Sequence, residues 1–197
     1  MRERILLGDL STQDADLLGR LTAYFDTLED RLRQGQGWLI FNSGSDRGAR
    51  IVAFILGRLN EYRPYFSYYH LPWRDFALHA YLSTVELPKD VPLLEQDGED
   101  SPRRREYTIA TGVATATSFH LKHADLVVLS NIRPSQLHET LVLSETATER
   151  TARRRATIAL TPHDPWTLAS AFAGADPSST TWRRFYDAMH QTSLVAV

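Results

Sequence analysis

Apolar residues recur every three or four positions in several stretches of the chain, which is the spacing of one face of an α-helix. The first stretch predicts a helix over residues 14–33, and its apolar positions are Leu17, Leu18, Leu21, Tyr24, Phe25, Leu28 and Leu32. Further helices are expected, in chain order, over residues 49–62, 72–82, 107–122, 134–151, 165–172 and 180–189.

Short continuous apolar runs lie between these helices and are typical of buried strands. They predict five strands, over residues 38–41, 65–70, 124–129, 156–161 and 193–197. Because strands and helices alternate, the expected fold class is α/β: a three-layer sandwich in which helices cover both faces of a mainly parallel sheet. We expect residues 1–197 to form a single domain, with residues 1–34 as a lead-in helical segment.

One segment breaks this alternation. Residues 87–106 contain several prolines and many charged side chains, so they predict a flexible surface loop. The ligands of parallel α/β sheets bind beyond the carboxyl ends of the strands. Residues 42–50, Ser130 with Asn131, and Thr161 with Pro162 follow three of the expected strands, so we expect them around one crevice.

Composition narrows the range of functions. The chain has 43% hydrophobic residues, a net charge of −2 and no cysteine. The absence of cysteine excludes disulfides, cysteine-bound zinc and a cysteine nucleophile, and it favours a reducing compartment. The chain shows neither a signal peptide nor an apolar run long enough to span a membrane, so a soluble, cytoplasmic protein with no membrane partner is expected.

Four segments carry a resemblance to a known family: residues 24–50, 124–132, 153–162 and 181–189. Their order and apolar pattern resemble the lead-in helix and phosphate loop, the Walker B strand, the sensor-1 strand and the last helix of an AAA+ core. The family is that of bacterial helicase loaders and transposition ATP-binding proteins of the DnaC/IstB type. The resemblance implies a P-loop NTPase-like sheet, and it covers the α/β core with no helical lid.

The sequence departs from that family at the positions that handle ATP. A working phosphate loop reads G-x-x-x-x-G-K-[ST], in which the lysine reaches the terminal phosphates and the hydroxyl binds magnesium. An ungapped comparison places these two positions at Gly48 and Ala49. The degenerate loop as a whole consists of Ser43, Gly44, Ser45, Asp46, Arg47, Gly48, Ala49 and Arg50.

The two Walker B acids, which would hold magnesium and orient water, correspond to Ser130 and Asn131. The sensor-1 asparagine corresponds to Pro162, which has no side-chain donor. We therefore assign no catalytic residue, and we expect neither ATP nor ADP with magnesium as a resident cofactor. His120 and His123 have metal-ligand spacing but lack a third ligand, so no metal is expected.

Two basic triplets are candidate contacts with a neighbouring subunit or with DNA: Arg103, Arg104 and Arg105, and Arg153, Arg154 and Arg155. The alternative is that each triplet is a solvated face beside acidic residues. Since the net charge is small, neither triplet by itself indicates nucleic acid as the main ligand.

Three functional hypotheses follow. The first is a non-hydrolysing scaffold or regulator in a DNA-replication or transposition assembly. Its partners would be AAA+ subunits, a replicative helicase or transposition proteins, and a homo-oligomer is compatible with this role. The second is an ATPase with a divergent loop, using Arg47 or Arg50 for phosphate and Asp46 or Asp125 for magnesium. The third is a DNA-binding accessory module using the basic triplets and an aromatic cluster: Tyr62, Tyr65, Phe66, Tyr68, Tyr69 and Trp73.

Overall fold

The structure is a computed structural model that describes residues 12–61, 66–84 and 102–197. Its strands are β1 (Gly37–Ile40), β2 (Tyr68–Pro72), β3 (Leu126–Ser130), β4 (Ala156–Leu160) and β5 (Ser193–Ala196). All of their pairings are parallel, and the strand order across the sheet is β2-β3-β4-β1-β5. The expected five-stranded α/β sheet is thus confirmed.

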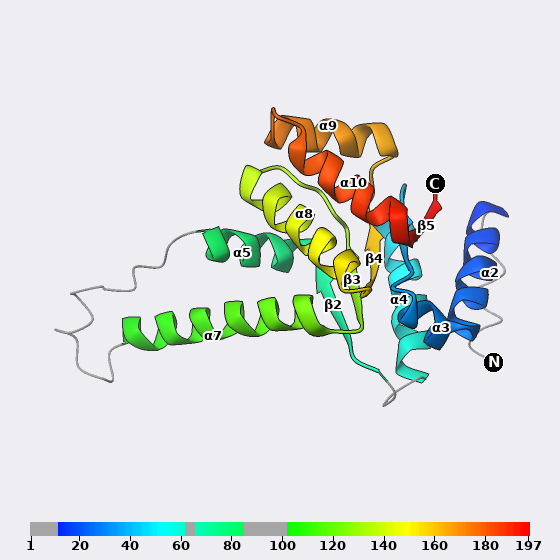
Figure 1. The fold of residues 1–197 in the computed structure, drawn as a ribbon, viewed down its shortest axis with the longest axis horizontal. Coiled ribbons are helices and arrows are strands. Elements are labelled where there is room, and N and C mark those ends of the chain that lie inside the picture. The colour runs from blue at the N-terminus through cyan, green and yellow to red at the C-terminus, as the bar shows by residue number, and fades with distance from the viewer. Residues whose placement is uncertain (1–11, 62–65, 85–101) are drawn as a thin grey trace.

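Helices cover both faces of the sheet (Figure 1). On one side lie α2 (Thr12–Asp26), α3 (Leu28–Arg33) and α4 (Ser45–Glu61). On the other side lie α5 (Trp73–Thr84), α7 (Pro102–His123), α8 (Leu137–Ala152), α9 (Pro165–Ala175) and α10 (Thr180–Thr192). None of the helices in these described ranges is long and apolar enough to cross a membrane.

Alternation along the strands builds two separate cores, because successive side chains of a strand point to opposite faces of the sheet. Trp38 and Ile40 pack with the helices α2 to α4, whereas Leu39 and Phe41 pack with the helices of the other face. All four are fully or almost fully buried. A sheet that is buried on both faces explains why its strands read as continuous apolar runs.

Several predicted boundaries were wrong. The first predicted helix is divided at Thr27 into α2 and α3. Helix α4 begins at Ser45, four residues before its expected start, so the predicted polar loop is shorter than the sequence suggested. Helix α7 begins at Pro102, which places residues 102–106 in a helix instead of a loop, while the remainder of the predicted flexible segment up to residue 101 lies outside the described residues.

Candidate functional site

The turn between β1 and α4 stands where a phosphate loop would lie. Only residues 41–44 separate the end of β1 from Ser45, the first residue of α4. Asp46, Arg47 and Gly48 are therefore already helical. A loop of the G-x-x-x-x-G-K type is longer, because it must wrap around the phosphates before its helix begins.

Backbone amides of this turn are bonded to the neighbouring strand connection. The N–H of Asn42 donates to the carbonyl of His163 (3.0 Å), and the N–H of Ser43 donates to the carbonyl of Thr161 (2.8 Å). The Ser43 hydroxyl donates to the same Thr161 oxygen at 2.8 Å. These donors fasten the turn to the end of β4 and are not directed at a ligand.

Arg47 closes the turn from the other side. Its Nε donates to Asp14 Oδ1 (2.6 Å), and its Nη1 donates to the carbonyls of Phe41 (3.2 Å) and Asn42 (2.8 Å). Asp14 also forms an ion pair with Arg50, at 3.7 Å. A phosphate loop presents amide donors to an anion, whereas here two carbonyl oxygens of the turn accept from a cation of the protein itself.

A small cleft of about 320 Å³ lies beside this turn. It is lined by Ser43, Gly48, Ala49, Val52, Ser130, Asn131, Arg133 and Leu160. As the sequence predicted, the β1–α4 turn and the end of β3 lie around one cleft. Pro162 adjoins the turn as well, since a Cβ at Gly44 would lie 3.9 Å from the Cβ of Pro162.

The side chains at the end of β3 are neutral and engaged with neighbours. Ser130 Oγ lies 3.0 Å from His70 Nε2 on the adjacent strand. Burial lowers the pKa of His70, with Asp75 acting in the opposite direction, so this imidazole is neutral at physiological pH. Asn131 has a left-handed backbone (φ 61°) and accepts a hydrogen bond from Arg133.

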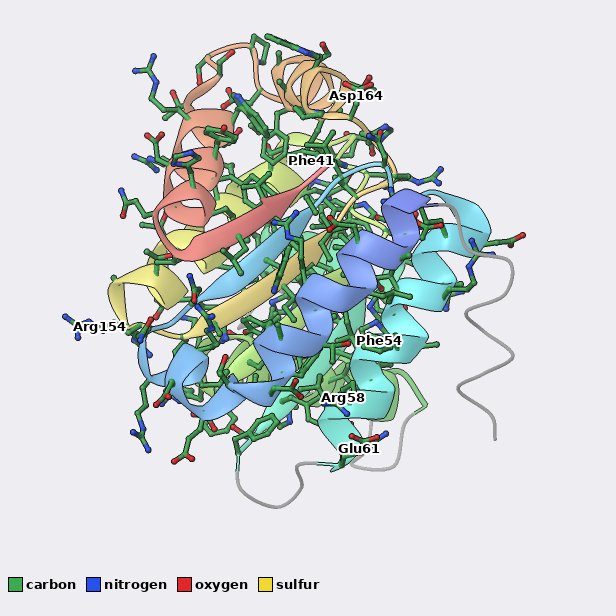
Figure 2. The ribbon with its side chains drawn as sticks, turned by 90° about the vertical axis from the view of Figure 1, so that its right-hand side faces the viewer. Phe41, Phe54, Arg58, Glu61, Arg154 and Asp164 are labelled. Atoms are coloured by element: carbon green, nitrogen blue, oxygen red, sulfur yellow. The ribbon has the colours of Figure 1, made fainter. Side chains whose placement is uncertain are left out.

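The triplet Arg153–Arg155 lies at the opposite end of the sheet, directly before β4. Figure 2 shows Arg154 far from Asp164, which marks the end near the cleft. Arg153 pairs with Glu149 at 2.8 Å, and Arg155 pairs with Asp125. These residues border a second hollow of about 800 Å³, formed with α2 and α3.

That placement corrects the magnesium assignment of the ATPase hypothesis. Asp125 precedes β3, at the amino ends of the strands, so it cannot act together with residues 42–50 at the carboxyl ends. Its pKa is lowered by hydrogen bonds from Ser67 and by the charge of Arg155, although burial opposes this shift as the largest single effect. Asp125 therefore links the amino end of β3 to Ser67 and to Arg155, which directly precedes β4.

The remaining candidates predicted from the sequence are the basic triplet at residues 103–105, the aromatic cluster and a metal site. Arg103–Arg105 belong to α7, but their side chains lie outside the described part of the structure, as do Tyr62 and Tyr65. Of the remaining aromatic cluster, Trp73 is 7% exposed and Tyr69 stacks on His120. These contacts indicate packing. No metal-binding group of side chains is found among the described residues.

Three residues of interest were not among the site residues predicted from the sequence: Asp14, Arg133 and Trp166. Asp14 is 33 positions from Arg47, so only the packing of α2 against α4 reveals the pair. Arg133 gives no signal because it belongs to no recognisable motif. Trp166 follows Pro165 at the start of a helix, and no pattern in the sequence indicates that its side chain is exposed.

Together, the parallel sheet, the turn after β1 and the cleft beside β3 define an α/β core with a cleft at the carboxyl ends of its parallel strands. A solved structure described as the crystal structure of the DnaC helicase loader is similar over 95% of this chain and 91% of that one, with a TM-score of 0.60 and 16% sequence identity. At this identity the similarity establishes the fold alone: this chain and the DnaC structure share the same arrangement of helices around a parallel sheet. No protein-family model and no curated protein sequence matches the chain.

Proposed function

We propose that this protein is a catalytically degenerate AAA+-like core that acts as a non-hydrolysing scaffold or regulator. The observation that carries the proposal is the closed turn after β1. Its amides at Asn42 and Ser43 bond to the β4–α9 connection, and its carbonyls accept from Arg47. A bound triphosphate would have to displace all of these contacts.

The residues around the cleft also do not fit a magnesium-bound nucleotide. Magnesium takes oxygen ligands, including carboxylates and substrate phosphates. Ser130 and Asn131 offer no carboxylate, and the described residues that line the cleft include no acid. Arg47 is held by Asp14 and by the turn, so it is not available to replace the missing lysine. We therefore derive no hydrolytic step for this site.

A role in assembly needs an interface, and α9 offers one. Trp166 is 84% exposed, whereas Trp38 and Trp73 are buried. Helix α9 carries no charged residue from Pro165 to Ala175. Exposed tryptophans on uncharged surfaces are enriched among the residues that dominate binding energy at protein interfaces. The DnaC protein is described as a helicase loader, so the partner we propose is a replicative helicase or another AAA+ subunit of such an assembly.

Substituting Trp166 with serine is expected to weaken binding to the replicative helicase of the same organism by at least about 2 kcal/mol, or roughly 30-fold. The free energy of unfolding should change by less than about 0.5 kcal/mol, because the side chain is exposed. Biolayer interferometry with the purified helicase, without nucleotide, provides the measurement. Leu78→Ser on α5, where the side chain is 57% exposed, is the matched control and should bind like the wild type. If Trp166→Ser binds the helicase as tightly as the wild type does, α9 is not part of the interface.

A further inference from the structure

The cleft beside β3 carries a positive charge where a related nucleotide site would carry acids. Of the residues that line it, Arg133 is the charged one, and the others are neutral. Magnesium would be repelled here, whereas an anion would be attracted directly. The loss of acids at Ser130 and Asn131 therefore changes the sign of the ligand that the cleft can hold.

Arg133 is positioned by its neighbour. Its Nε donates to Asn131 Oδ1 at 3.0 Å, and both of these side chains are exposed. Within residues 12–61, 66–84 and 102–197, no carboxylate forms an ion pair with Arg133, and its two terminal nitrogens have no hydrogen-bond acceptor. A guanidinium held at Nε with both terminal nitrogens available is suited to bidentate binding of an oxyanion.

Further donors lie on the same short segment. The side-chain nitrogen of Asn131 remains available when its oxygen accepts from Arg133. The Ser130 hydroxyl is hydrogen-bonded to His70 Nε2, and the tautomer of the neutral imidazole decides which of the two groups donates. When His70 donates through Nε2, the Ser130 hydroxyl keeps its own proton free for a ligand. The charge of Arg133 also acts on His163: burial is the main cause that lowers the pKa of His163, and the positive charge of Arg133 lowers it further.

We propose that residues 130–133 form a metal-free oxyanion site, in which Arg133 binds a phosphate group or a carboxylate directly, assisted by Asn131 and Ser130. The site lies in the cleft but does not depend on the closed turn or on the scaffold role proposed above. A partner's acidic side chain and a free phosphate share the same chemistry, because both present two oxygens to a guanidinium.

Titration with inorganic phosphate in the presence of EDTA, followed by NMR of backbone amides and of the Arg133 Nε–H, tests the proposal. Saturable shifts at residues 130–133 are expected, and added magnesium should not strengthen binding. Arg133→Gln should weaken phosphate binding by at least about tenfold, because it removes a charge-assisted hydrogen-bond pair. Arg183→Gln, on the exposed side of α10, is the control and should leave the titration unchanged.

A parallel titration with glutarate distinguishes the source of the anion. Tighter binding of glutarate identifies a partner's acidic side chain, and tighter binding of phosphate identifies a phosphate group. The proposal is overturned if neither anion shifts residues 130–133, if Arg133→Gln binds like the wild type, or if binding requires magnesium. Those outcomes leave the scaffold role intact, since that role is tested separately, by nucleotide binding at residues 42–50 and by helicase binding of the Trp166→Ser variant.

Discussion

Replacing Arg150 with methionine is expected to lower the free energy of unfolding by about 3–5 kcal/mol. Arg150 is 1% exposed and donates to the carbonyls of Leu121, Ala124 and Ala156 and to the hydroxyl of Thr157. Burial is the main cause that lowers its pKa, to about 10, so it stays protonated at neutral pH. Methionine would fill the space but leave these acceptors buried without a donor.

One of those acceptors, the carbonyl of Leu121, lies in the last turn of α7, and Ala124 directly follows the helix. The last carbonyls of a helix have no partner within the helix. Arg150 thus joins α7 to α8 and β4, and its loss should affect the whole cooperative unit. Urea-induced unfolding followed by far-UV circular dichroism gives the measurement. Arg153→Met, which removes an exposed ion pair with Glu149, is the control and should cost less than about 1 kcal/mol. A change below about 1 kcal/mol for Arg150→Met would contradict this account.

Adding a single methyl group at Gly48 is expected to lower the free energy of unfolding by about 2–3 kcal/mol. A Cβ at this position would lie 2.3 Å from the carbonyl oxygen of Ser43. That oxygen cannot move easily, because the amide and hydroxyl of Ser43 are both bonded to Thr161. The control is Gly57→Ala in the same helix, where no atom lies within 4 Å of the added Cβ. It should raise stability by about 0.5–1 kcal/mol, since alanine is the better helix former.

The same contact bears on the lost lysine. Position 48 corresponds to the lysine of a phosphate loop, but any side chain there must first force the turn open. Gly48→Lys is therefore expected to destabilise the protein without creating magnesium-dependent ATP binding. A Gly48→Lys variant that unfolds at the wild-type urea concentration and binds ATP with micromolar affinity would show that the turn opens readily, contrary to our account.

The sequence predicted the five strands because each is a continuous apolar run between polar segments. It predicted the helix starts less well, for a physical reason. Helix α4 begins with Ser45, Asp46 and Arg47, and α7 begins with a proline followed by charged residues. Polar residues and proline are favoured in the first turn of a helix, but in a sequence they resemble a loop.

For the candidate site, the sequence revealed what is missing but not what replaces it. The absence of a lysine and of two acids can be read directly from residues 48, 130 and 131. The closure of the turn depends on contacts between Arg47 and Asp14 and between Ser43 and Thr161, which are far apart in the chain. Such pairs are set by packing, and periodicity does not encode them.

The most direct test of the central claim is calorimetric titration of the protein with ATP and with ADP in the presence of magnesium. The closed turn predicts no saturable binding tighter than millimolar for either nucleotide, with no dependence on magnesium. Micromolar binding that requires magnesium and is lost in Arg47→Ala or Arg50→Ala would contradict the claim, because it would mean that the turn opens into a working phosphate loop.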